Sequence, residues 1–407
     1  MNSHYIKFRD YFIFILITIF SCDDPNYPED IWDGDDTGGE TPVITNVEPS
    51  GGAFAGIDTV TITGQNFSDT ETKNIVYFNS LLGNVVDATS TRILVVPPNL
   101  VSDSVKIKVA VQGAFLFGEY NAKYILTAAV VDYGPFDQFT DIYSLDLDNQ
   151  ENIFVSMDAS PNAEFWKVDT NQDSVVWSGS LSKGAGMKLG PDGNIYYVNS
   201  QRFLCKDLEG TPKENSEIFK RLNGNASDLD FDTHGNLYAS GSGSSIDVVD
   251  ISDNDGLTSG VTEVKDLGDL DTKCLRVFGS WVYILTKNVF AEEAIYRLPI
   301  LDASGALGDL ELVFDWTSYS NKDFSALCFA ITEGGSLLVG SDSQTQPLTL
   351  IESIGPSPFY PTVLTPPISY MAWGNSQYLY VINRTEETNR VQRIDTRMNG
   401  AAYYGRP

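Results

Sequence analysis

The chain has 407 residues, of which 42% are hydrophobic and 12% aromatic, and its formal net charge is −29. This excess of acidic residues excludes nucleic acid as an expected partner, because binding phosphates requires clustered Lys and Arg. With 34 glycines and little sign of long amphipathic helices, the composition favours an all-β protein with room for two or three domains.

The first 22 residues are predicted to be an export signal. Lys7 and Arg9 precede an apolar run, residues 11–20, that is too short to span a bilayer. The run ends in Ile19-Phe20-Ser21-Cys22, which resembles a bacterial lipobox. The resemblance implies cleavage before Cys22 and lipidation of its thiol, so the protein would be held at a membrane by its lipid anchor. An ordinary secretory signal is the alternative.

Residues 23–41 are predicted to form a flexible tether. Eight acidic residues, with Gly and Pro among them and almost no apolar clusters, cannot bury enough surface to fold. Acidic residues directly after Cys22 resemble the surface-export signal of Bacteroidota-type lipoproteins. That resemblance implies a location in the outer membrane, facing the cell exterior.

Residues 42–127 are predicted to form the first folded domain. Residues 60–63 alternate apolar and polar side chains as a half-buried strand does, and further strands are expected at 75–78, 85–88, 93–96 and 105–111. This is the spacing of an immunoglobulin-like sandwich. The segment resembles an IPT/TIG domain in its opening Pro-x-Ile, its Thr-Ile-x-Gly-x-Asn-Phe phrase at 61–67 and its residues 91–97. The resemblance implies a spacer role, with direct ligand contact as the alternative.

A short phrase recurs along the rest of the chain: apolar residues, a polar turn ending in Gly-Asn, and an apolar–aromatic pair. It is clearest at 189–196 and 231–238. A marker on the second residue after each turn recurs at steps of 42, 42, 45, 55 and 42 residues, at Phe154, Tyr196, Tyr238, Tyr283, Leu338 and Tyr380. A period in the low forties with several strands per unit is typical of a β-propeller. The six markers therefore predict a six-bladed β-propeller over residues 128–407.

The sequence also predicts how the propeller closes. Each blade needs four antiparallel strands with the marker on the second, and outermost strands are expected at 174–178, 217–221, 262–266, 311–315 and 361–365. The sixth blade lacks such a strand, so we predict that the N-terminal strand 128–133 completes it and protects its edge. The blades resemble NHL repeats and the six-bladed propellers of the gluconolactonase and regucalcin type.

Two sets of residues are predicted to form the functional face. The Gly-Asn turns are structural, so binding is expected on the opposite face, where the remaining loops lie. Its aromatic loops predict a ligand-binding strip of Phe136, Phe139, Trp316, Tyr319, Asn321, Asp323 and Tyr370. Polar groups at the ends of the second strands are expected around the channel mouth, namely Asn199, Ser240, Lys287, Asp342 and Asn383. For each aromatic residue the alternative is that it caps the propeller core.

The available side chains restrict the chemistry. After Cys22 the only histidine is His234, in a predicted structural turn, so a Ser-His-Asp triad and a multi-histidine zinc site are not expected. Cys205, Cys274 and Cys328 are expected to be buried free thiols, with a Cys274–Cys328 disulfide as the alternative. We predict no catalytic residue, no metal site and no cofactor.

The aromatic loops favour glycan binding, because sugar rings stack on Trp and Tyr while Asn, Asp and Lys meet the hydroxyls. The arrangement is similar to accessory lipoproteins of Bacteroidota Sus-type uptake systems. That similarity implies a polysaccharide or oligosaccharide ligand and an outer-membrane transporter as partner. Two alternatives stay open: a metal-dependent lactonase or hydrolase, although the Glu-Gly-Pro phrase of the gluconolactonases is missing, and a protein-binding module.

Overall fold

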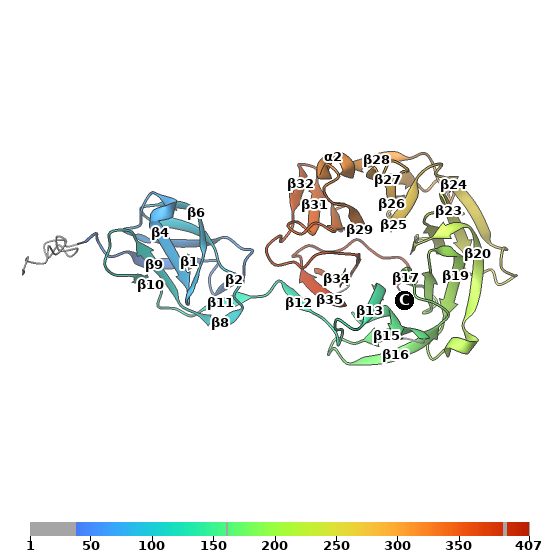
Figure 1. The fold of residues 1–407 in the computed structure, drawn as a ribbon, viewed down its shortest axis with the longest axis horizontal. Helices are drawn as coiled ribbons and strands as arrows, with labels where there is room; N and C mark the ends of the chain where they lie inside the picture. The colour runs from blue at the N-terminus through green and yellow to red at the C-terminus, as the bar shows by residue number, and fades with distance from the viewer. Residues whose placement is uncertain (1–37, 160–161, 386–388, 407) are drawn as a thin grey trace, which may run out of the picture.

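The computed structural model describes residues 38–159, 162–385 and 389–406, which form two domains side by side (Figure 1). The expected export signal, Cys22 and most of the expected tether lie outside the described residues. In the part of the chain that is described, no helix is long and apolar enough to cross a bilayer.

The N-terminal domain is a β-sandwich. One sheet has the order β1 (Val43–Glu48), β3 (Val60–Gln65), β7 (Arg92–Val96) and β6 (Asn84–Thr89); another has β10 (Gly118–Glu119), β9 (Ile107–Val111), β4 (Asn74–Phe78) and β5 (Leu81–Leu82); a third has β2 (Gly52–Phe54), β11 (Tyr124–Thr127) and β8 (Ser102–Val105). Val60 and Ile62 of β3 are fully buried, as their alternation predicts. Gly64 is required where it stands, because a Cβ there would lie 1.9 Å from the carbonyl oxygen of Val43.

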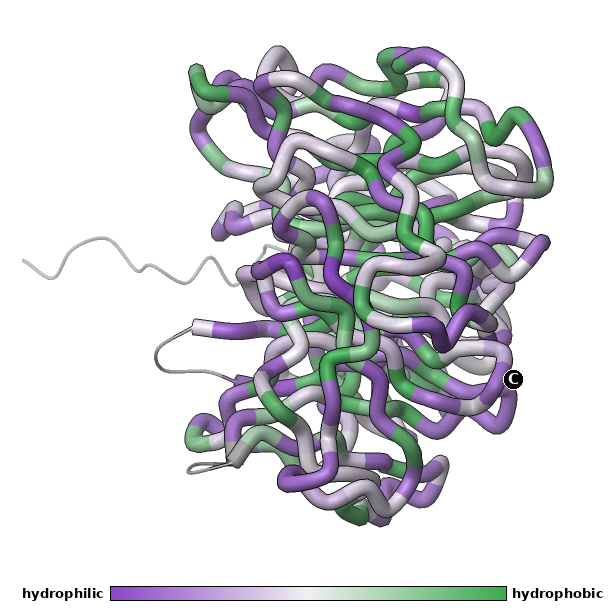
Figure 2. Tube along the Cα trace, turned by 90° about the vertical axis from the view of Figure 1, so that its right-hand side faces the viewer, coloured by the Kyte–Doolittle hydropathy of each residue, from purple (hydrophilic) through white to green (hydrophobic). Residues whose placement is uncertain are grey.

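The second domain is a six-bladed β-propeller, with its blades arranged in a ring (Figure 1). Five blades consist of consecutive strands: β13 (Asp141–Leu147), β14 (Ile153–Ala159), β15 (Asn162–Val168) and β16 (Ser174–Ser180); β17 (Gly186–Leu189), β18 (Ile195–Val198), β19 (Gln201–Asp207) and β20 (Glu217–Ala226); β21 (Asp228–Phe231), β22 (Asn236–Ser240), β23 (Ser245–Asp250) and β24 (Val261–Asp266); β25 (Asp271–Phe278), β26 (Trp281–Lys287), β27 (Glu293–Pro299) and β28 (Glu311–Asp315); β29 (Ala326–Ile331), β30 (Leu337–Ser341), β31 (Leu348–Glu352) and β32 (Gly355–Pro358). Each marker lies on the second strand of its blade, and the predicted fold class is confirmed. Short hydrophobic and hydrophilic stretches alternate along the chain, as half-buried strands require (Figure 2).

The sixth blade joins the two ends of the propeller. It contains β33 (Tyr370–Trp373), β34 (Tyr378–Arg384), β35 (Asn389–Asp395) and, on the outside, β12 (Val130–Asp132). Strand β12 pairs antiparallel with β35, with Val130 opposite Ile394. This is the strand that the sequence assigns to closing the ring.

The fifth predicted outermost strand, at 361–365, is wrong. The outermost strand of that blade is β32, which precedes this segment. Residues 361–363 form a turn instead, and Thr362 donates a hydrogen bond of 2.7 Å from Oγ1 to the carbonyl of Gly56 in the sandwich.

The Gly-Asn turns have a shared internal structure that explains the recurring phrase. Asp232 Oδ1 accepts hydrogen bonds from the backbone N–H groups of His234 and Asn236, at 2.8 and 3.0 Å. Its Oδ2 accepts from Asn236 Nδ2 at 2.8 Å and from the marker hydroxyl of Tyr238 at 3.3 Å. Gly235 has a φ of 85°, which favours glycine. His234 therefore belongs to a structural turn.

The sandwich contacts the propeller directly. The guanidinium of Arg397 bonds both carboxylate oxygens of Asp58, at 2.7 Å each, and its Cζ lies 4.0 Å from the centre of the Phe54 ring. A groove of about 580 Å³ lies beside this contact, with residues of both domains in its walls. The two domains are therefore joined by an ion pair as well as by the backbone that connects them.

We expect Asp58→Asn to loosen this contact. Burial alone would raise the pKa of Asp58, but hydrogen bonds from Arg397 and from the amide of Phe54 outweigh it and hold that pKa below its ordinary value of 3.8. Because the charged form holds Arg397, the contact is expected at neutral pH and is lost as pH falls through the lowered pKa. Separate tumbling of the domains, measured by ¹⁵N relaxation, would reveal the release.

The matched control is Asp132→Asn, which breaks an ion pair of 3.2 Å with Arg390 inside the propeller. It is expected to leave the tumbling unchanged. Joint tumbling in the Asp58→Asn variant would show that the Arg397–Asp58 pair does not couple the domains.

Candidate functional site at the mouth of the propeller channel

The innermost strands of the six blades line the channel with equivalent residues. On the innermost strand of each blade, one residue pairs with the marker residue of the second strand. These six residues line one common cavity: Asp146, Lys188, Asp230, Arg276, Ala330 and Ala372. Four consecutive members of this ring alternate in sign, and Lys188 Nζ lies 3.5 Å from Asp146 Oδ1. Burial raises the pKa of Asp230, against the opposing effect of the charges on Lys188 and Arg276.

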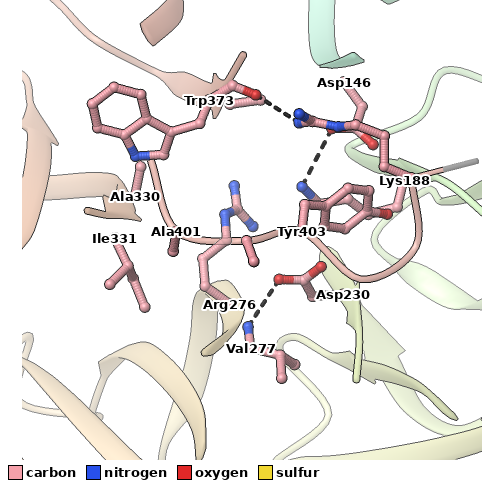
Figure 3. Close-up of a pocket in the computed structure, with 13 residues that line it drawn as sticks. Asp146, Lys188, Asp230, Arg276, Val277, Ala330, Ile331, Trp373, Ala401 and Tyr403 are labelled. Carbon is pink, nitrogen blue, oxygen red and sulfur yellow. Dashed lines mark hydrogen bonds and ion pairs between the residues drawn. The ribbon is translucent and has the colours of Figure 1, made fainter. Parts of the chain in front are cut away.

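The C-terminal residues close this end of the channel. Residues 401–406 pass beside the ring, and the inner cavity that remains is only about 40 Å³ (Figure 3). The Tyr403 hydroxyl donates to the carbonyl of Leu189 at 2.8 Å, and Lys188 Nζ lies 4.5 Å from the centre of the Tyr403 ring. Arg406 donates to the carbonyl of Trp373 at 2.6 Å. This end therefore holds a few waters at most.

Arg276 divides the channel. Its guanidinium donates to Asp228 Oδ2 at 2.6 Å and to the carbonyl of Met371 at 3.1 Å, which connects two blades that are not neighbours. Its Cζ lies 5.5 Å from the centre of the Tyr370 ring. Arg276 lines the inner cavity, whereas Asp228 and Tyr370 line a second cavity on the other side of it. The channel is thus blind rather than open from end to end.

The second cavity, of about 180 Å³, forms the mouth of the channel on the loop side. Its rim takes one residue from each blade, at or just before the innermost strand: Tyr143, Ala185, Ser227, Lys273, Leu327 and Ser369. All six are partly exposed. Asp228, Cys274, Cys328 and Tyr370 lie deeper, and Arg384 stands at the side. Hydroxyls, a carboxylate and cations thus face one small cavity.

Cations gather around Tyr143 and Lys273. Lys183 Nζ donates to the Tyr143 hydroxyl at 2.6 Å and pairs with Asp158 at 2.6 Å. Lys273 Nζ lies 2.9 Å from Glu293, which is 5% exposed. The Cζ of Arg384 lies 4.0 Å from the centre of the Tyr143 ring. The arrangement can donate several charge-assisted hydrogen bonds to a ligand.

The predicted aromatic strip is partly wrong. Trp316 is 0% exposed, and its Nε1 donates to the carbonyl of Phe324 at 3.3 Å, so its ring cannot stack on a sugar. It belongs to the short helix α2 (Trp316–Ser320), capped by Asp315, and packs edge to face against Tyr319 at 5.4 Å. The alternative that this tryptophan caps the core is the correct one, because the helix turns the indole inward.

The other loop residues are scattered. Tyr319 donates to Gln346 at 3.2 Å, while Asn321 and Asp323 are exposed beyond the end of α2. Phe136 packs against the core, and Phe139 is 85% exposed. Of the predicted strip, the structure brings Tyr370 to the mouth cavity, where its hydroxyl lies 3.3 Å from Asp228 Oδ1.

The predicted channel-mouth residues lie outside the mouth cavity. Asn199 donates to Ser182, Ser240 donates to Thr272, and Asn383 donates to the carbonyl of Pro367. Asp342 accepts from the amide of Ser325, and Lys287 is exposed. The reason is geometric: the second strand of a blade lies one strand spacing, about 4.8 Å, further from the axis than the first. None of these five side chains lines the mouth cavity.

The three described cysteines are buried free thiols, as predicted, and the Cys274–Cys328 disulfide is absent. Burial raises the pKa of the Cys274 thiol to about 12, which disfavours a reactive thiolate. Within residues 38–159, 162–385 and 389–406, no three His, Cys, Asp or Glu side chains are grouped so as to hold a metal ion.

The fold and the blind channel define an all-β protein in which an immunoglobulin-like sandwich precedes a six-bladed β-propeller. Residues 42–124 match the family model of the IPT/TIG domain. No curated protein matches the sequence significantly.

A solved structure from Bacteroides shares this fold over most of both chains. A protein described as a putative phosphatase from Bacteroides thetaiotaomicron is 12% identical, with 89% of this chain and 98% of that one covered and a TM-score of 0.54. Auxiliary nutrient binding proteins from Bacteroides thetaiotaomicron and Bacteroides ovatus are 12% and 14% identical, cover 89% and 87% of this chain and 98% of their own, and have TM-scores of 0.48 and 0.46. At these identities the likeness concerns the fold alone.

Proposed function

We propose that this protein is a cell-surface lipoprotein that binds a saccharide in the mouth of its propeller channel. The observation that carries the proposal is the blind channel, closed below by Arg276 and the C-terminal residues and open to the loop side. A concave cavity with convergent polar groups is the usual form of a ligand site.

The mouth cavity suits one sugar residue or the end of a glycan. Its volume of about 180 Å³ is below the roughly 300 Å³ at which sites for larger ligands begin. Hydroxyl groups of Tyr143, Ser227 and Ser369 and the ammonium of Lys273 can exchange hydrogen bonds with sugar hydroxyls, while Leu327 offers an apolar contact.

The surface role rests on the sequence. Cys22 would carry the lipid, the acidic residues after it would form the tether, and the sandwich would separate the propeller from the membrane. A saccharide held in this way could be passed to an outer-membrane transporter, which we propose as the partner.

Ala185→Trp is expected to weaken saccharide binding more than tenfold, because it fills the mouth cavity while removing no polar contact. The chain without its first 22 residues would be run in affinity electrophoresis against a polysaccharide panel, and any binding quantified by titration calorimetry. Val176→Trp, at a 52% exposed position on the outermost strand β16, is the size-matched control and should bind normally.

A second variant distinguishes saccharide binding at the mouth cavity from binding at the loops. Phe139→Ala removes the 85% exposed aromatic of the loop before β13 and is expected to leave affinity unchanged. Loss of binding in Phe139→Ala with full binding in Ala185→Trp would move the site to the loops. No binding to any saccharide by the unaltered chain would refute saccharide capture.

A further inference from the structure

Resting on the proposed function, we infer that the saccharide bound at the mouth carries a carboxylate and that Arg384 is the group that binds it. The ligand class is thus an acidic, uronate-bearing glycan rather than a neutral one.

The charge at the mouth contrasts with that of the whole chain. The chain has 26 basic and 55 acidic residues, yet Lys273 and Arg384 line one cavity, and Lys183 donates to the hydroxyl of Tyr143 at its rim. A cationic spot on a strongly acidic protein attracts anionic ligands locally, while the surrounding charge repels them elsewhere. Such a concentration of the rarer charge favours an anionic ligand.

The cations at the mouth differ in how they are paired. Lys183 pairs with Asp158, Lys273 with Glu293, and Arg276 below them with Asp228. Within the described parts of the chain Arg384 forms no ion pair, and its guanidinium lies over the ring of Tyr143. Among the residues that the structure describes, the charge of Arg384 at this cavity is therefore not matched by a carboxylate.

The side chain of Arg384 is also held in a suitable orientation. It is the last residue of β34, whose backbone pairs with β35, so the base of the side chain is anchored by the sheet. A guanidinium that lies over an aromatic ring contacts the ring with one face of the guanidinium, while the N–H donors of the guanidinium lie in the guanidinium plane. These donors match the two oxygens of a carboxylate in a bidentate pair. The contact with the Tyr143 ring thus holds the guanidinium at the cavity, and no acceptor among the described residues takes up its donors.

The neighbouring groups supply the rest of a sugar site. Tyr143, Ser227, Lys273 and Ser369 line the same cavity as Arg384 and can meet the hydroxyls of the ring that bears the carboxylate. A neutral sugar would leave the Arg384 charge without a carboxylate partner among the described residues. We therefore expect discrimination between a uronate and its uncharged counterpart.

The test compares acidic, neutral and sulfated polysaccharides on the chain lacking its first 22 residues. Polygalacturonate, alginate and hyaluronan carry carboxylates, dextran and galactan are neutral, and dextran sulfate offers a different anion. We expect retardation by at least one uronate polymer and little by the others. Methyl esterification of polygalacturonate, if it is the ligand, should lower affinity about tenfold or more, since it removes the charge and keeps the sugar.

Variants at Arg384 locate the effect. Arg384→Gln is expected to lose about tenfold or more in affinity for the uronate, and Arg384→Lys to recover part of it, because lysine keeps the charge without the planar fork. Arg297→Gln is the matched control: Arg297 also lies over an aromatic ring, that of Trp281, at 4.1 Å, but away from the mouth. Thermal unfolding of each variant checks that it is folded.

The outcomes separate the two proposals. Equal binding of neutral and acidic glycans, unchanged in Arg384→Gln, would overturn the carboxylate inference and leave saccharide capture standing. Preference for dextran sulfate over every uronate would also overturn it. Failure of all polysaccharides to bind would overturn saccharide capture and the carboxylate inference together.

Discussion

Asp228→Ala is expected to lower the free energy of unfolding by about 3–5 kcal/mol, because it leaves a buried guanidinium without its counter-ion. Asp228 is 1% exposed and Arg276 is 7% exposed, and their 2.6 Å contact lies in the middle of the channel. Asp228 Oδ2 also accepts from the amide of Leu275 at 2.9 Å, so the substitution removes a link between neighbouring blades as well.

Denaturant unfolding of the purified chain would measure the effect, with two comparisons. Asp228→Ala combined with Arg276→Met removes both charges and is expected to recover part of the loss, since the guanidinium is no longer left without its counter-ion. Asp87→Ala, which breaks the exposed pair between Asp87 and Arg92, should cost less than about 1 kcal/mol. Equal destabilisation by the single and double channel variants would argue that the charge is not the cause.

Deleting residues 400–407 is expected to be the second large effect, of the order of 3–5 kcal/mol, since several hydrogen bonds of about 1 kcal/mol each are lost with their packing. The segment bonds four blades, through the carbonyls of Ile331, Leu189 and Trp373 and the amide of Gly279. Its loss also uncovers the charged ring formed by Asp146, Lys188, Asp230 and Arg276.

The same deletion tests the separation of the two cavities. Because Arg276 lies between them, saccharide affinity at the mouth should change little while the unfolding transition shifts to lower denaturant. Tyr403→Phe, which removes one hydrogen bond to Leu189, should reproduce about 1 kcal/mol of the loss. A truncated chain as stable as the full one would mean that the ring of blades holds together without these residues.

Much of the fold could be predicted from the sequence because local chemistry repeats in each blade. Asp232, Gly235 and Asn236 build their turn from near neighbours, and the hydroxyl of Tyr238 returns to the same aspartate. Such short-range patterns survive in the sequence. The sequence pattern of the outermost strand in a blade is weaker, because one face of that strand is exposed. The segment at 361–365, expected to be such a strand, forms part of the contact between the two domains instead.

The site was harder to predict because it depends on which strand faces the axis. Trp316 and Tyr370 both suit a sugar by residue type, yet a helical turn buries the first in the core and a first strand brings the second to the mouth. A usable signal did exist: the residues paired with the markers form the channel ring. No such signal pointed to Arg384, because its place in the proposed site depends on contact with Tyr143, which is far away in the sequence.

The pairing of β12 with β35 also has a consequence for how the protein folds. Five blades consist of consecutive strands and can form as the chain emerges, whereas the sixth joins Val130 to Ile394. Contacts between such distant segments form late, because the loop between them must first be closed. Until then β35 has an unpaired edge, and β12 of a second molecule could complete it. Domain-swapped dimers are therefore the misassembled product to expect during refolding at high protein concentration.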